Sequence, residues 1–141
     1  MTRSPYDALA ALRSLAVSGE LGALCVRHDV ELLVAHGSAV DPEPLRPPRD
    51  LDLAFRARHG TEPDVVALVN DLLDATRFDD LDLMDLHRAG RVASARALSP
   101  DCVVLYKASP GLFASAQMAA ITIAMETAWL RRMDLELPAE R

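Results

Sequence analysis

The chain has 141 residues, of which 50% are hydrophobic and 26% are charged, so it carries enough apolar material for a folded core and is not a disordered sequence. Its net charge of −6 argues against a general nucleic-acid binder, because such proteins present a basic surface to the phosphate backbone. Cys25 and Cys102 lie far apart, with no CxxC pair and no signal peptide, which favours reduced thiols in a cytoplasmic protein. We expect one domain over residues 1–141.

The first part of the chain predicts a helix, a strand and a loop, in that order. Residues 6–17 have the apolar spacing of an amphipathic helix. Residues 31–35 are a short apolar run that ends at Gly37 and Ser38, as expected of a buried strand that meets a turn. Residues 39–49 contain four prolines, which predicts a loop with little regular structure.

The middle of the chain predicts two strands around a helix. Residues 50–55 alternate polar and apolar side chains, as a half-buried strand does. A helix is expected to begin at Thr61, whose hydroxyl would cap it together with Asp64 three residues on, and to continue to about Thr76. Residues 80–86 predict a third strand.

The last part of the chain predicts a short helix at residues 91–98, a strand at 102–106 and a long helix at 112–135. The apolar stretch at 111–130 has about the length of a membrane span, but it contains polar residues and ends at two arginines. We therefore expect a helix that packs on the domain or on a partner, and no membrane. Helices and strands are mixed throughout, so the predicted class is α/β or α+β.

Gly37 and Ser38 come directly after the predicted strand at residues 31–35. A glycine lets the backbone approach a ligand closely, and a serine hydroxyl with neighbouring N–H groups can bind phosphate oxygens. The same dipeptide is also ordinary turn chemistry, so by itself it leaves open both a phosphate site and a plain turn.

Asp50 and Asp52 stand two positions apart in the predicted strand at residues 50–55. Residues i and i+2 of a strand point to one face, so both carboxylates should project together while Leu51 and Leu53 face the core. Two carboxylates this close repel each other without a cation, and Mg²⁺ prefers such oxygen ligands. The pair therefore predicts a magnesium site, with a solvated strand face as the alternative.

Asp82 lies in the next predicted strand, at residues 80–86. If the two acidic strands are neighbours, Asp82 joins Asp50 and Asp52, and three carboxylates can hold two Mg²⁺ ions for an in-line phosphoryl displacement. Asp82 can also accept the proton of the attacking hydroxyl. Three other acidic residues nearby compete for this role: Asp79, Asp80 and Asp85. Of these, Asp85 should face away from Asp82 in a regular strand.

In this combination and order, the elements resemble the minimal nucleotidyltransferase (MNT) family of the DNA polymerase beta superfamily. The resemblance covers about residues 30–107. Its specific part is the Gly-Ser pair followed by the DxD pair. The matching segments are Leu32–Ser38, Arg49–Phe55, Leu81–Leu86 and Val103–Tyr106.

The resemblance implies a nucleotidyltransferase-type fold, with a small mixed β-sheet flanked by helices and a long C-terminal helix. It also implies Mg²⁺ and ATP, with AMP transferred to an acceptor hydroxyl and pyrophosphate released. By residue, Gly37 and Ser38 would hold the triphosphate, Asp50 and Asp52 would hold metal, and Asp82 would be the third carboxylate and the base. Many bacterial members are antitoxins that adenylylate a tyrosine of a HEPN-domain toxin, so a toxin of that kind is the expected partner.

The chain departs from the family pattern in the segment after Gly-Ser. That segment is proline-rich and lacks glycine, and Arg49 stands where a serine often precedes the DxD pair, so Arg46 or Arg49 is the candidate for a phosphate-facing cation. Two alternatives therefore stay open. One is a catalytically degenerate antitoxin that neutralises its partner by binding alone, and the other is an enzyme that modifies an aminoglycoside-like small molecule.

Overall fold

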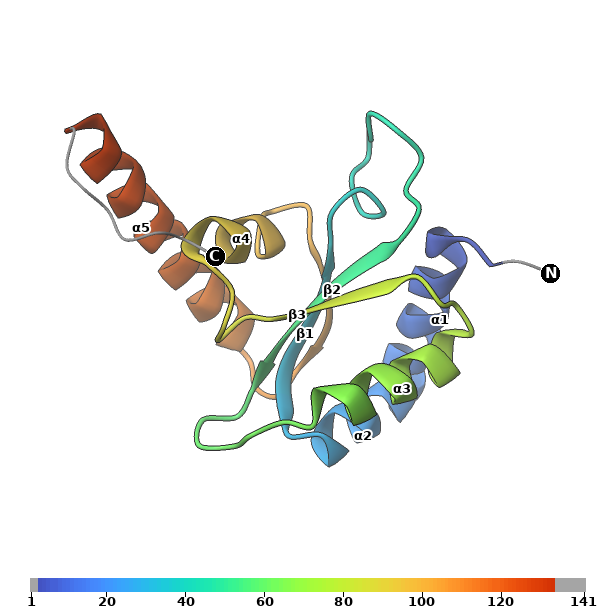
Figure 1. Ribbon diagram of the computed structural model, residues 1–141. Helices are drawn as coiled ribbons and strands as arrows, with labels where there is room; N and C mark the ends of the chain where they lie inside the picture. Colours follow the sequence, from blue (N-terminus) through green and yellow to red (C-terminus); the bar gives the residue numbers. More distant parts are fainter. Residues whose placement is uncertain (1–2, 134–141) are drawn as a thin grey trace.

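The computed structural model describes residues 3–133, which form a four-stranded sheet with helices on both faces (Figure 1). The helices on one face are α1 (Pro5–Ser18), α2 (Glu20–Arg27) and α3 (Val65–Thr76), and those on the other are α4 (Arg91–Ala97) and α5 (Leu112–Arg132). The strands are β1 (Val30–His36), β2 (Leu51–Ala57), β3 (Leu81–Asp85) and β4 (Val103–Lys107). The predicted α+β class, mixed sheet and long C-terminal helix are confirmed.

The strand order is β3-β2-β1-β4, with β1 antiparallel to β2 and to β4, and β2 parallel to β3. The C-terminal end of β1 therefore meets the N-terminal ends of β2, β3 and β4 along one edge of the sheet. We call this the Gly37 edge, after the residue that follows β1. The Gly-Ser pair follows β1 at this edge, and Asp52 and Asp82 lie near the starts of β2 and β3 there.

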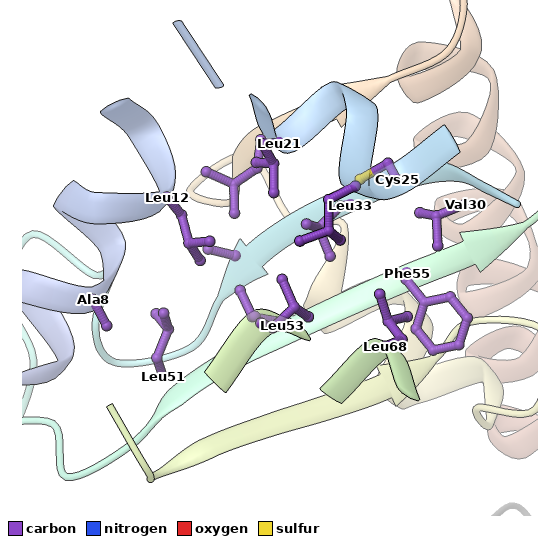
Figure 2. Close-up of a cluster of buried hydrophobic side chains, with 14 of the residues drawn as sticks. Ala8, Leu12, Leu21, Cys25, Val30, Leu33, Leu51, Leu53, Phe55 and Leu68 are labelled. Carbon is purple, nitrogen blue, oxygen red and sulfur yellow. The ribbon is translucent and has the colours of Figure 1, made fainter. Parts of the chain in front are cut away.

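Strand β2 shows how the sequence pattern divides the two faces. Leu51, Leu53 and Phe55 are fully buried in the cluster under α1, α2 and α3, as Figure 2 shows. The intervening Ala54 packs in the second cluster, under α4 and α5, so Asp52 lies on that face as well. The prediction that Leu51 and Leu53 face the core is confirmed.

Helix α2 is absent from the predicted elements. Gly19 has a φ of +90° and serves both as the end of α1 and as the start of α2, so the chain turns by 90° between the two helices. A one-residue boundary and an interior glycine, Gly22, give residues 20–27 a weak helical signal in the sequence. In the structure its buried side chains are Leu21, Leu24 and Cys25.

The predicted start of α3 is wrong by several residues. Its N-cap is Asp64, whose side chain accepts a hydrogen bond from the Ala67 backbone N–H at 3.1 Å. Thr61 instead donates its hydroxyl to the Arg58 carbonyl at 2.7 Å. Pro63 explains the difference, because a proline disfavours helical geometry in the residue before it, and the helix begins only beyond it.

Other boundaries move by one to three residues. The strand predicted at 50–55 spans Leu51–Ala57, and the long helix predicted to reach residue 135 ends at Arg132, with residues 134 and 135 outside the described part of the chain. Among residues 3–133 no single helix is long and apolar enough to cross a membrane; α1 and α2 satisfy that criterion only as a bent pair, and only by length and composition.

Candidate functional site

Two strand pairings align His36, Asp52 and Asp82 across the sheet. Asp52 in β2 is the register partner of His36 in β1 and of Asp82 in β3. The three residues lie at the Gly37 edge, on the face covered by α4 and α5. The condition set by the sequence, that the two acidic strands be neighbours, is met, and the structure places Asp52 beside Asp82.

Gly37 brings the turn after β1 against the first of these carboxylates. Its φ of +79° is a left-handed conformation that residues with a Cβ rarely adopt. A Cβ built at Gly37 would collide with Oδ2 of Asp52. Glycine is therefore needed at this position both for the turn and for the close approach of the backbone to Asp52.

The Asp52 carboxylate is crowded by like charge. Burial, followed by the neighbouring carboxylates of Asp50 and Asp82, raises the pKa of Asp52 from 3.8 to about 6. A carboxylate in this environment is stabilised by a proton or by a cation. The electrostatics predicted from the DxD spacing are thus present in the folded chain.

Asp50 differs from the expectation. It is exposed and lies in a bend before β2, and the pairing of β2 with β3 begins only at Leu51. The rule that residues i and i+2 share a face of a strand therefore does not strictly apply to Asp50. Its charge still contributes to the raised pKa of Asp52, so the two groups share one electrostatic environment.

The carboxylates at this edge are the side chains that could hold a metal ion together with a ligand. Within residues 3–133, no group of three His, Cys, Asp or Glu side chains is arranged to hold a metal ion. Mg²⁺ is usually bound through one or two carboxylates, with water and substrate phosphates completing its coordination. Asp52 and Asp82, with Asp50 close to them, supply oxygen donors of this kind.

His36 is half-buried and is the register partner of Asp52 in the neighbouring strand. Burial lowers the pKa of His36, while the charge of Asp82 acts in the opposite direction. Its Nε2 atom is buried and has no hydrogen-bond partner in the part of the chain that the structure describes. Burial thus favours the neutral form of the His36 imidazole.

Of the three competing acidic residues, one lies far from the Gly37 edge and two directly precede β3. Asp85 is at the opposite end of β3, where its Oδ1 accepts a hydrogen bond from the His87 backbone N–H at 2.9 Å. This contact supports the structural role predicted for Asp85. Asp79 and Asp80 are exposed residues just before β3, and the Asp80 carbonyl accepts a hydrogen bond from Leu51 N–H at 2.9 Å.

A cleft of about 690 Å³ opens beside Gly37 and Ser38. Its walls include Arg46 and Arg49 of the proline-rich loop, as the sequence suggested for a phosphate-facing cation. They also include Arg96 and Ser99, at the end of α4 and just after it, which the sequence reasoning missed. No local pattern could have found these two residues, because the α4–β4 connection reaches the Gly37 edge only through the pairing of β4 with β1.

No protein-family model and no curated protein matches the sequence. Solved structures match the fold. A toxin–antitoxin crystal structure with AMP-PNP has a TM-score of 0.62 and 20% identity, over 80% of this chain and 90% of that one. The complex of an MNT antitoxin with tri-AMPylated Shewanella oneidensis HEPN toxin has a TM-score of 0.62 and 18% identity, over 86% of this chain and 93% of that one. The toxin–antitoxin MntA–HepT has a TM-score of 0.60 and 18% identity, over 82% of this chain and 90% of that one.

These similarities are of fold, because the identities are low. All three structural neighbours are toxin–antitoxin complexes, one of them between a HEPN toxin and an MNT antitoxin, and the matches cover most of both chains. The nucleotidyltransferase-type fold expected from the sequence resemblance is therefore confirmed.

Proposed function

We propose, from the fold that this chain shares with MNT antitoxins, that it is a Mg²⁺-dependent nucleotidyltransferase. It transfers AMP from ATP to a hydroxyl of a partner HEPN-type toxin and acts as the antitoxin. The observation that carries the proposal is the meeting of Gly37, Asp52 and Asp82 at one edge of the sheet. A Gly-Ser turn pressed against crowded carboxylates suits a ligand that brings both phosphates and a cation.

Each predicted site residue has a role in this proposal. Gly37 and Ser38 bind the triphosphate, and Asp50 and Asp52 hold the metal. Bound magnesium supplies neutralisation of the phosphate charge. The acceptor oxygen forms a bond to the α-phosphorus, the bond from that phosphorus to the bridging oxygen breaks, and pyrophosphate leaves. Asp82 lies beside Asp52 and takes the proton of the hydroxyl, for which we propose a tyrosine of the toxin.

Helix α5 supports the role of a protein partner. Its buried residues, Ala116, Ala120 and Thr127, mark the side that packs on the body of the protein. The opposite side carries large apolar residues that are each more than half exposed and recur at helical spacing. We call this set the α5 stripe (Met118, Met125, Trp129 and Met133). Since the structural neighbours are complexes with HEPN toxins, we propose a toxin of that kind as its occupant.

The direct test is transfer of labelled AMP from ATP to the co-purified partner, with wild type, Asp52→Asn and Asp79→Asn. Asp79 is an exposed carboxylate near the site and serves as the matched control. We expect Asp52→Asn to reduce transfer by more than about a hundredfold, beyond what loss of an outer-shell partner causes, and Asp79→Asn to leave it unchanged. Calorimetric binding of ATP with and without Mg²⁺ should show the same pattern. Undiminished transfer by Asp52→Asn would exclude the mechanism.

A second function is favoured by one observation, the proline-rich segment at residues 39–49, which lacks the glycine that often follows Gly-Ser in the family. In this alternative the chain is a degenerate antitoxin that neutralises its partner by occlusion. The double variant Asp50→Asn/Asp52→Asn separates the two functions in a growth assay with the toxin. Full neutralisation by the double variant would favour occlusion, and loss of neutralisation with retained complex formation would favour transfer.

A further inference from the structure

The cleft beside Gly37 and Ser38 has a different character from the carboxylate edge that it adjoins. Asp50, Asp52 and Asp82 do not line it. Its lining consists of the turn after β1, the proline-rich loop and the α4–β4 connection. The charged and hydroxyl residues among the lining are Ser38, Asp41, Arg46, Arg49, Arg96, Ser99 and Asp101.

The three arginines of this cleft are unengaged. Arg46, Arg49 and Arg96 are exposed, and none forms a hydrogen bond or an ion pair with another residue of the described chain. By contrast, the carboxylate of Asp41 already accepts a hydrogen bond from the Glu43 backbone N–H at 2.9 Å. The three arginines face the carboxylates of Asp41 and Asp101 in the same lining, so the cleft keeps a small formal positive charge in a protein whose net charge is −6.

Guanidinium groups that converge on one cleft select a particular ligand chemistry. Their planar forks match the oxygens of a phosphate, to which they donate two hydrogen bonds at once. The hydroxyls of Ser38 and Ser99 have no hydrogen-bond partner within residues 3–133, so they add two further donors. A cleft with several such groups fits a chain of phosphates better than a single carboxylate.

The loop is also stiff. Pro42, Pro44, Pro47 and Pro48 restrict the backbone around the two loop arginines, because each proline has a nearly fixed φ. A restricted loop loses less conformational entropy when it binds a ligand. The feature that departs from the family pattern in the sequence thus holds cationic side chains at the rim of the cleft.

We propose that this arginine cleft is a polyphosphate site in which Arg96 of α4 acts with Arg46 and Arg49 to hold the pyrophosphate portion of the nucleotide, and that it binds a polyphosphate without metal. The assignment of the nucleotide rests on the proposed function, whereas binding of a polyphosphate by the cleft does not. Gly37 and Ser38 lie at the boundary between the carboxylates and the arginines. When the whole nucleotide is bound, its α-phosphate therefore faces the carboxylates and its remaining phosphates extend among the arginines.

The test is calorimetric titration of the full chain with sodium tripolyphosphate in EDTA. We expect wild type to bind, and Arg96→Gln and Arg49→Gln to weaken binding roughly ten- to hundredfold, the range for a hydrogen bond to a charged group. Arg13→Gln, at an exposed arginine of α1, is the control that removes the same charge elsewhere. Circular dichroism verifies that each variant is folded. Arg96→Lys should recover only part of the affinity, because it restores the charge without the fork.

Two outcomes would overturn the proposal: no binding by wild type in EDTA, or equal weakening by Arg13→Gln, which would reveal a general charge effect. Wild type alone separates this proposal from the proposed function, because tripolyphosphate binding in EDTA requires neither Mg²⁺ nor AMP transfer. Tripolyphosphate binding with no AMP transfer by wild type would leave the cleft assigned and reject the enzyme. Transfer by wild type that Arg96→Gln and Arg49→Gln leave unchanged would reject the cleft as the pyrophosphate site.

Discussion

Gly37 couples the turn after β1 to the Asp52 carboxylate, because a Cβ at position 37 would force that carboxylate to shift. Gly60 offers a matched comparison: its φ is +81°, close to the +79° of Gly37, yet a Cβ there would meet no atom within 4 Å. An alanine would therefore be strained by the left-handed backbone at both positions, but only at position 37 would its Cβ collide with the Asp52 carboxylate. This pair allows the contribution of close approach to be measured by itself.

We expect Gly37→Ala and Gly60→Ala each to lose about 1–2 kcal/mol of stability from the left-handed backbone. Gly37→Ala should lose more, and it alone should weaken binding of Mg²⁺-ATP, by at least roughly tenfold, because Asp52 is displaced. Urea denaturation and calorimetry measure the two effects. If both variants bind Mg²⁺-ATP equally well, the contact with Asp52 has no part in the site.

The raised pKa of Asp52 predicts a pH-dependent stability of the metal-free protein. The folded chain holds the proton of Asp52 more tightly than the unfolded chain does. The contribution of this proton to stability is therefore fully present below the unfolded pKa of 3.8 and is lost as pH rises through the folded pKa of about 6. In EDTA at pH 7.5, Asp52→Asn should therefore raise Tm by a few degrees, and at pH 3.5 the difference should vanish. A Tm that is lower for Asp52→Asn at pH 7.5 would contradict the assignment.

At the scale of elements, the beginning of α3 depends on a single side chain. Asp64 accepts the Ala67 N–H and places a negative charge at the positive end of the helix dipole. We expect Asp64→Ala to reduce the free energy of unfolding by about 1 kcal/mol, and Asp64→Asn, which keeps the acceptor, to reduce it by less. Urea denaturation measures both losses, and equal losses in the two variants would mean that the charge of Asp64, and not its hydrogen bond to Ala67, stabilises the start of the helix.

Helix α5 is the element at which we expect the partner to bind. Its C-terminal half extends beyond the sheet (Figure 1), and Trp129 of the α5 stripe lies in that half. We expect Trp129→Glu to prevent co-purification with the HEPN-type toxin while leaving ATP binding unchanged. Val17→Glu on α1, at a side chain that is 91% exposed, is the control for adding a charge at an apolar surface position. A complex that survives Trp129→Glu would place the interface elsewhere, and a change in the mass of the free protein would indicate self-association through the stripe.

At the scale of the whole molecule, the pattern of alternation predicted most of the sheet. The sequence DLDLAF places leucines toward a core and carboxylates away from it, and β2 does this from Leu51 onward. The neighbourhood of Asp52 and Asp82 could be anticipated because both lie near the start of a strand. What local patterns could not supply was contact between distant segments: the separation of Asp50 from the strand register, the turn at Gly19, and the arrival of Arg96 at the cleft.

The two faces of the sheet are covered unequally. Leucine, valine and phenylalanine dominate the cluster under α1, α2 and α3, whereas most of the cluster under α4 and α5 is alanine, namely Ala54, Ala97, Ala116 and Ala120. Because smaller side chains bury less apolar area, the α4–α5 layer should open in local unfolding events that leave the rest of the fold intact. Amide hydrogen exchange should accordingly be faster in α5 than in α1 or β1, and a toxin bound along the α5 stripe would slow it there. Cleavage of the unbound chain by cellular proteases would then depend on how often the α4–α5 layer opens, and a bound partner would slow this cleavage.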